Sequence, residues 1–224
     1  MTYEIEYAYT SHVGKIRANN EDNFWCCGES LPAQNFGTSG IFTGSAFMKS
    51  LPVIAVFDGM GGESCGEIAA ETAVREFGRF YGENREKLRK FPEEFLEEVC
   101  DSMNREVVRY GEENRIGSMG TTAAVVAFSR DGVYVGNLGD SRVYYSEENK
   151  FQQISVDHVI GRSFLGETAS DAVSWDYGRR ADTGALYYKT SLCGRKSLSP
   201  LFRWHDGYAF RWRNFRYSYE GDFT

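Results

Sequence analysis

A short apolar run in the first third of the chain most strongly constrains its fold. Val53–Phe57 is entirely apolar and is followed at once by Asp58–Gly62, which reads Asp-Gly-Met-Gly-Gly. A continuous apolar run of this length is typical of a strand buried on both faces, and a glycine-rich segment stops such a strand. The sequence therefore predicts that Asp58 lies at the end of a buried strand.

Two helices and several further strands are predicted around this run. Apolar residues recur at helical spacing over Gly66–Tyr81 and again over Phe91–Glu113. Strands, two adjacent helices and then more strands form an α+β order, in which we expect the helices to pack on one face of an antiparallel sheet. The predicted strands are Glu4–Thr10, Asn23–Cys27, Thr121–Phe128, Gly132–Leu138, Ser141–Tyr145 and Phe151–Ile154, with hairpin turns at Arg130–Gly132 and Glu148–Asn149.

Composition and charge exclude several classes of partner. The 224 residues carry a formal net charge of −7, which argues against nucleic acid or an anionic membrane, because both attract positive surfaces. Residues 1–10 hold no apolar run of signal-peptide length, and no stretch approaches the roughly 20 apolar residues of a membrane span. The five cysteines form no C-x-x-C pair, which indicates reduced thiols. We expect a cytoplasmic protein whose oligomeric state the sequence leaves open.

Carboxylates gather between the predicted strands at four places, namely Glu21-Asp22, Asp58, Asp140 and Asp157. Mg²⁺ and Mn²⁺ prefer oxygen ligands, so carboxylates on strand ends and loops can bridge a pair of these ions. Two such ions about 3.5–4 Å apart activate a water and hold a phosphoryl group for in-line displacement. A single carboxylate in such a loop is more often a turn residue, because Asp favours loops. Only the pattern of the whole set can decide between the two interpretations.

Five segments of the sequence form an ordered set, namely Arg17–Asn23, Val56–Gly62, Met119–Thr122, Gly136–Arg142 and Ser155–His158. In this order they resemble the motifs of metal-dependent (type 2C) protein phosphatases. The resemblance covers roughly residues 3–158 and implies a central antiparallel β-sandwich flanked by helix pairs, with a metal centre at one end. It implies hydrolysis of phosphoserine and phosphothreonine, with two or three Mg²⁺ or Mn²⁺ ions as cofactors and phosphoprotein substrates of a Ser/Thr kinase as partners.

The resemblance also assigns metal-binding roles to single residues. Asp58 would bridge two ions, and Gly59 would offer its backbone carbonyl. Glu21 and Asp22 would serve the second ion directly or through water. Asp140 would line a third-metal position that some bacterial members show.

Arg17 and Asp58 are the two residues that the resemblance places in catalysis. Arg17 matches the phosphate-binding arginine of the family, and a planar guanidinium suits that task because it can contact two phosphate oxygens. Without the neighbouring motif, a solvated arginine would be the simpler interpretation. Met60 stands where some members have a histidine, so a general acid is unassigned.

The last third of the chain departs from the family pattern. Residues 166–224 show no sustained strand or helix period and few aliphatic residues. The family supplies two further metal aspartates there, in a Ser-Asp-Gly segment and a late Asp-Asn pair, and neither segment is present; Asp206-Gly207 follows His205 rather than an apolar strand. We therefore divide the chain into a phosphatase-like part, 1–165, and an aberrant tail, 166–224, expected to be disordered or poorly packed.

A one-base shift of the reading frame, or truncation, is our hypothesis for this tail. Trp204 has a single codon, and with His205 behind it a shift by one base forces glycine. Continuing in that frame over Phe202–Phe210 permits Ser-Asp-Gly, and the same shift forces a second glycine at Trp175. The nucleotide sequence decides between this hypothesis and a divergent native tail.

Three interpretations of function remain open. The first is a Mg²⁺- or Mn²⁺-dependent phosphatase acting on phosphoserine or phosphothreonine. The second is a catalytically inactive, truncated phosphatase remnant or a phosphoprotein-binding module, because half of the family's metal ligands are missing. Metal-dependent hydrolysis separates these two. The third, a nucleic-acid or membrane adaptor, is favoured only by arginines of the tail such as Arg211, Arg213 and Arg216, and salt-sensitive binding would be its mark.

Overall fold

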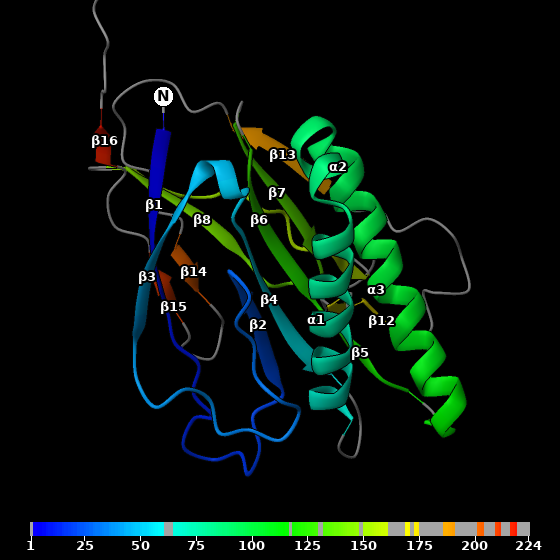
Figure 1. Ribbon diagram of the computed structural model, residues 1–224. Helices are drawn as coiled ribbons and strands as arrows, with labels where there is room; N and C mark the ends of the chain where they lie inside the picture. The colour runs from blue at the N-terminus through cyan, green and yellow to red at the C-terminus, as the bar shows by residue number, and fades with distance from the viewer. Residues whose placement is uncertain are drawn as a thin grey trace, which may run out of the picture.

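The computed structural model describes residues 2–60, 65–116, 118–129, 132–147 and 150–160, and six short strands between residues 169 and 218. Two layers of antiparallel strands face each other, and helices cover the outer side of one layer (Figure 1). This arrangement confirms the predicted α+β class and the antiparallel sandwich.

The larger layer is an antiparallel sheet centred on β4 (Val53–Met60). In this sheet β4 lies between β2 and β6, and β7 continues the sheet beyond β6. All side chains of β6 and β7 are buried, as expected for strands covered on both faces. Its other members are β2 (Asp22–Cys26), β5 (Gly120–Thr121), β6 (Ala123–Ser129), β7 (Gly132–Leu138), β12 (Val173–Ser174) and β13 (Leu186–Thr190).

The second layer consists of smaller antiparallel sheets. One contains β1 (Thr2–Tyr9), and another contains β8 (Val143–Glu147). Ile5 of β1 and Val143 of β8 join the apolar core that fills the space between the layers. The remaining short elements are β3 (Phe42–Phe47), η1 (Met48–Ser50), β9 (Lys150–Gln153), β10 (Val159–Ile160), β11 (Ala169–Ser170), β14 (Leu201–Arg203), β15 (Ala209–Arg211) and β16 (Arg216–Ser218).

Three helices follow β4 in the sequence. They are α1 (Gly66–Glu83), α2 (Arg85–Lys90) and α3 (Pro92–Asn114), and α1 and α3 lie side by side on the larger sheet (Figure 1). Their apolar faces and the facing strand residues form a second core. The prediction of two amphipathic helices on one face of the sheet is therefore confirmed, and none of the described helices is long and apolar enough to cross a membrane.

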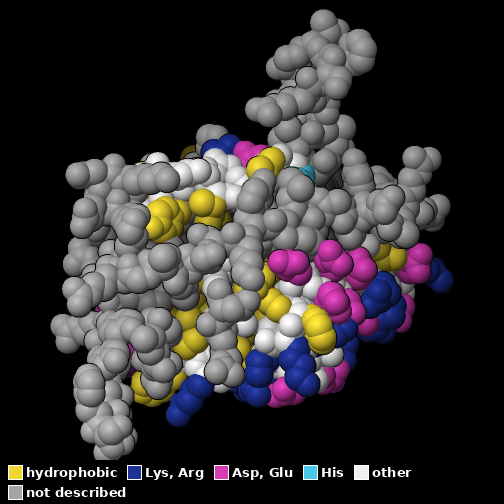
Figure 2. All heavy atoms as spheres, turned by 90° about the horizontal axis from the view of Figure 1, so that it is seen from above, with side chains coloured by type: hydrophobic (Ala, Val, Ile, Leu, Met, Phe, Trp, Pro, Cys, Tyr) yellow, Lys and Arg dark blue, Asp and Glu magenta, His cyan; other side chains and the backbone are white. Residues whose placement is uncertain are grey.

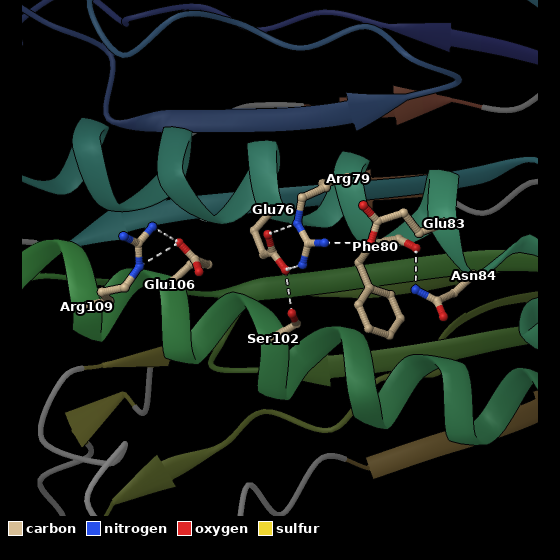
Figure 3. A network of polar contacts seen from close by, with 8 residues as sticks. All are labelled: Glu76, Arg79, Phe80, Glu83, Asn84, Ser102, Glu106 and Arg109. Atoms are coloured by element: carbon tan, nitrogen blue, oxygen red, sulfur yellow. Dashed lines mark hydrogen bonds and ion pairs between the residues drawn. The ribbon is translucent and has the colours of Figure 1, made fainter.

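A buried carboxylate joins the two long helices. Glu76 of α1 is 6% exposed, and its carboxylate accepts hydrogen bonds from Arg79 and from the Ser102 hydroxyl of α3 (Figure 3). Burial alone would raise the pKa of Glu76, but the hydrogen bonds from Arg79 and Ser102 outweigh it and lower that pKa from its ordinary value of 4.5. The α1–α3 contact therefore contains one polar link within an apolar surface.

The outer side of the helices is charged and of mixed sign. Basic and acidic side chains alternate there in the view of Figure 2. Ion pairs one helical turn apart, such as Arg79 with Glu83 and Arg89 with Glu86, account for this pattern. On the faces of the helices that the structure describes, opposite charges therefore lie side by side.

Some element boundaries differ from the predictions. Strand β4 runs on to Met60 because β5 pairs with its last two residues and keeps the glycine in the sheet. Strand β3 and the short helix α2 had no prediction, and β8 begins at Val143 rather than Ser141. The predicted turn at Glu148–Asn149 and residues 130–131 lie outside the described residues, as does most of the tail, whose predicted disorder stays a prediction.

Candidate active site

Two carboxylates face each other where β2 begins and β4 ends. The register of these antiparallel strands places Asp22 directly opposite Asp58, and both residues are half-buried. Residues opposite each other in such a pair project to the same face, with Cβ atoms about 4.5–5.5 Å apart, and like charges at this spacing repel. A bound cation would turn this repulsion into attraction, because carboxylate oxygens are ligands that Mg²⁺ and Mn²⁺ prefer.

Three backbone segments meet at Gly59, immediately after Asp58. Its N–H donates to the carbonyl of Glu21 over 3.2 Å, which ties β4 to the residue before β2. A Cβ at position 59 would lie 2.0 Å from the Gly66 carbonyl oxygen, and one at position 66 would lie 2.8 Å from the Gly59 carbonyl oxygen. Only glycine fits at both positions, so the first residue of α1 can approach the carboxylates.

The Glu21 side chain lies at the same place. Its carboxyl carbon would be 3.2 Å from a Cβ at Gly66, so it sits against the first turn of α1, where the helix dipole favours negative charge. Arg17 Nη1 lies 3.5 Å from Glu21 Oε2, and both side chains keep contact with solvent. The structure therefore brings Arg17 and Glu21 to the end of the sheet that carries Asp58.

Asp140 lies on the turn after β7 and is exposed. Gly139 takes a φ of +91° in this turn, a conformation that favours glycine. The amide of Asn137 donates to the carbonyls of Gly139 (3.1 Å) and Val156 (3.0 Å), and the His158 N–H donates to Gly139 over 3.0 Å. The turn is thus held to the 155–158 segment while the Asp140 side chain faces solvent.

Two buried hydroxyls connect the Asp140 turn to Asp58. The Asp58 N–H donates to Thr122 Oγ1 over 3.0 Å, and the Thr122 N–H donates to the Asp58 carbonyl over 2.9 Å. Thr122 Oγ1 in turn hydrogen-bonds to the hydroxyl of Ser141, the residue after Asp140. Thr121 and Thr122 are fully buried, so the Gly-Thr-Thr segment supports the core. The contact with Ser141 had no signal in the sequence, because a serine in a turn carries no distinguishing pattern.

Asp157, the fourth acidic position, is engaged differently. Its carboxylate accepts from Arg142 Nε at 3.0 and 2.9 Å and from Gln153 Nε2 at 2.8 Å. The hydrogen bond with Asp157 also raises the pKa of Arg142 above its ordinary value. Arg142 therefore neutralises Asp157, a carboxylate that the resemblance did not assign to a metal ion.

The donors that meet at Asp58 suit a hard cation. They are carboxylate and carbonyl oxygens, and the glycine contact gives backbone access that any side chain would block. Within the ranges given above, no group of three or more His, Cys, Asp or Glu residues is arranged to hold a metal ion.

Comparison with known proteins identifies a family for part of the chain. Residues 43–175 match the family model described as protein phosphatase 2C. The serine/threonine phosphatase stp of Listeria welshimeri is 30% identical over 154 residues, which is 68% of this chain and 54% of that protein. The chain thus spans about half the length of the curated relatives it matches.

Solved structures share the fold. The S. agalactiae serine/threonine phosphatase superposes with a TM-score of 0.64 and 20% identity, over 89% of this chain and 79% of that one. The catalytic domain of the serine threonine protein phosphatase PstP, solved with two manganese ions, gives a TM-score of 0.63 and 19% identity over 90% and 77%. With the family match over more than half of its residues, this chain belongs to the protein phosphatase 2C family.

Proposed function

We propose that this protein hydrolyses phosphoserine and phosphothreonine in proteins, using Mg²⁺ or Mn²⁺ in a two-metal centre. The observation that carries the proposal is the register of β2 and β4, which sets Asp22 opposite Asp58. Two facing carboxylates are a costly arrangement for a fold unless a cation lies between them. Family membership and the PstP structure with two manganese ions support the same conclusion.

Each proposed site residue has a distinct task. Asp58 would hold both ions, and the Gly59 carbonyl together with Glu21 and Asp22 would complete their protein ligands. When bound, such ions lower the pKa of a water and neutralise phosphoryl charge. A third ion would be served by Asp140, which is exposed and can accept a ligand without losing a buried contact.

Arg17 would bind the substrate phosphate. Its guanidinium is exposed and lies close enough to Glu21 to be oriented by it, yet an exposed pair at 3.5 Å is weak enough to exchange. A phosphate dianion offers a stronger, two-point contact than this carboxylate. Arg17 can therefore turn from Glu21 to the substrate at little energetic cost.

The physiological setting that we propose is the bacterial cytoplasm, with phosphoproteins made by a Ser/Thr kinase as substrates. The relatives are bacterial serine/threonine phosphatases, including protein phosphatase PhpP of Streptococcus pneumoniae. Nucleic acid and membranes are not proposed as partners, because the chain carries a net charge of −7.

Hydrolysis of an aryl phosphate with and without Mn²⁺ tests the proposal. We expect turnover only with Mn²⁺, and we expect Asp58→Asn to lower it by about a thousandfold, since bound metal contributes several kcal/mol to the transition state. Glu112→Gln, at an exposed position near the end of α3, is the control for loss of one negative charge. Full Mn²⁺-dependent turnover by Asp58→Asn would sink the assignment.

A second candidate is a phosphoprotein-binding module without catalysis. It is favoured by the missing Ser-Asp-Gly and Asp-Asn segments, which in the family supply two further metal aspartates. Binding of a phosphopeptide together with no Mn²⁺-dependent turnover would select this candidate. Restoring the alternate reading frame after Gly166 should then produce turnover.

A further inference from the structure

We propose that two loops beside Arg17 form a docking surface for a phosphopeptide that carries an apolar residue next to its phosphorylated residue. The loops are residues 12–20 and 35–41, named the docking loops here, and their contacts with the peptide are Ile16 and Phe36. The proposal rests on the proposed function, because it names the substrate class of the same site. It also specifies what the substrate must offer besides a phosphate.

Large apolar side chains stand exposed on these loops. Ile16 is 97% exposed, Ile41 75% and Phe36 73%, the three highest values among the large apolar side chains that the structure describes. A single exposed apolar side chain needs no explanation, but several on one pair of loops indicate a contact surface. Both docking loops lie at the lower end of the sandwich in Figure 1, the end at which β2 begins.

The docking loops are held together by their backbones and by two asparagines. The Val13 N–H donates to the Phe36 carbonyl over 3.3 Å, and the Asn20 N–H donates to the Asn35 carbonyl over 3.1 Å. The side-chain amide of Asn20 donates to the Asn35 side chain over 2.9 Å. A peptide binding to this braced surface loses less free energy to loop ordering than one binding to a free loop.

The charge of the first docking loop favours a phosphopeptide over other occupants. Residues 12–18 carry Lys15 and Arg17 and no acidic residue, although the whole chain has a net charge of −7. This local positive charge complements a phosphate dianion. It is too small to hold an anionic membrane, which needs several basic residues.

The position of Ile16 sets the geometry of recognition. Ile16 directly precedes Arg17, and consecutive Cα atoms are about 3.8 Å apart. A peptide whose phosphate contacts Arg17 therefore places its neighbouring side chains within reach of Ile16. Phe36, whose carbonyl bonds to Val13, extends the apolar contact along the second loop.

Equilibrium binding of labelled peptides in the presence of Mn²⁺ tests the proposal without requiring turnover. The probe is a fluorescein-labelled peptide containing a hydrolysis-resistant phosphonate analogue of phosphothreonine, flanked by isoleucine in one form and by serine in the other. We expect the protein to bind the isoleucine form about tenfold more tightly, as for burial of one aliphatic side chain. Ile16→Ser combined with Phe36→Ser should abolish this preference. The exposed residue Phe91, at the start of α3, provides the matched control Phe91→Ser, which should retain the preference.

Each contrary outcome has a defined meaning. Equal affinity for the two peptides, no binding of either, or a preference that survives in the double variant overturns the docking surface. If an unphosphorylated isoleucine peptide binds as tightly as the phosphonate form, the loops form a general apolar surface, and this result also contradicts the proposal. Absence of Mn²⁺-dependent aryl phosphate hydrolysis counts against the proposed function alone, because the peptide preference is measured separately.

Discussion

The helix-covered side of the central sheet and the end of the sheet that carries Asp58 are built from different interactions. On the helix-covered side, fully buried rings such as Phe57, Phe77 and Phe95 pack between sheet and helices. At the Asp58 end, glycine contacts, buried hydroxyls and opposed carboxylates take their place. We therefore expect changes on the helix-covered side to affect mainly stability, and changes at the Asp58 end to affect mainly metal binding.

The largest expected effect is on stability and follows from a change in the helix-covered region. Phe77 is fully buried and contacts the rings of Trp25 and Phe57. Phe77→Ala should lower the free energy of unfolding by about 3–5 kcal/mol, because it leaves a cavity. Urea unfolding measures this loss, and the exposed Phe91→Ala is the control. If the remaining folded protein showed altered Mn²⁺ affinity, the two regions would not be separable.

The next effect belongs to the Asp58 end. Thr122→Val removes the hydroxyl that joins the Asp58 N–H to Ser141 while keeping the side chain's shape. We expect Mn²⁺ affinity to fall by about 10–100-fold, as when groups that orient metal ligands are lost. Calorimetric titration with Mn²⁺ measures the change, and Thr122→Ser, which retains the hydroxyl, should largely preserve the affinity. Equal affinities for the valine and serine variants would contradict the role of this hydroxyl.

A smaller effect is expected at Arg17, on the exposed side of the same end. Arg17→Ala should raise KM for a phosphopeptide by about tenfold and change kcat by less than about twofold, because a ground-state phosphate contact contributes mostly uniform binding. Steady-state kinetics with Mn²⁺ decide this, with Lys90→Ala, at an exposed position at the end of α2, as the control for loss of one positive charge. An unchanged KM would remove Arg17 from the site.

The smallest expected effect concerns Glu76, the buried carboxylate within the apolar helix-covered region. The lowered pKa of Glu76 means that its stabilising contribution is present above pH 4.5 and is lost as the pH falls below that value. Between pH 7 and 3 we expect a loss of about 1 kcal/mol that is absent in Glu76→Gln. Urea unfolding at several pH values measures it. Glu106→Gln, in the more exposed pair with Arg109 (Figure 3), should retain the pH dependence, and an identical slope in Glu76→Gln would refute the prediction.

Hydrophobic periodicity was enough to predict most of the fold. The two long helices and the β4, β6 and β7 strands were recognisable because each buries a regular stripe or a continuous run of apolar residues. Strand β3 was missed because its side chains are exposed or half-buried and its sequence, Phe-Thr-Gly-Ser-Ala-Phe, has a glycine in the middle.

The candidate site was predictable only in part. A turn rich in Asp and Gly marks Asp58 and Gly59, but that Asp22 lies opposite Asp58 depends on strand register, which single residues do not specify. The contact between Gly59 and Gly66 had no signal, because a glycine at the start of a helix also has ordinary explanations. The pairing of Asp157 with Arg142 could not be predicted either, because a local sequence pattern does not specify which distant residue a carboxylate will contact.

The pairing of β2 with β4 also determines when the site can form during folding. The two strands are separated in the chain by the second docking loop, residues 35–41, and by β3, and closing such a loop costs chain entropy. The helices α1 and α3 are joined by a much shorter connection, α2 and its flanking residues, so they can pair earlier. On a ribosome, Asp22 emerges well before its partner strand has been made. The opposed carboxylates therefore arise only after β4 has docked, so a folding intermediate with helices but no β2–β4 pairing would have nothing to offer a metal ion.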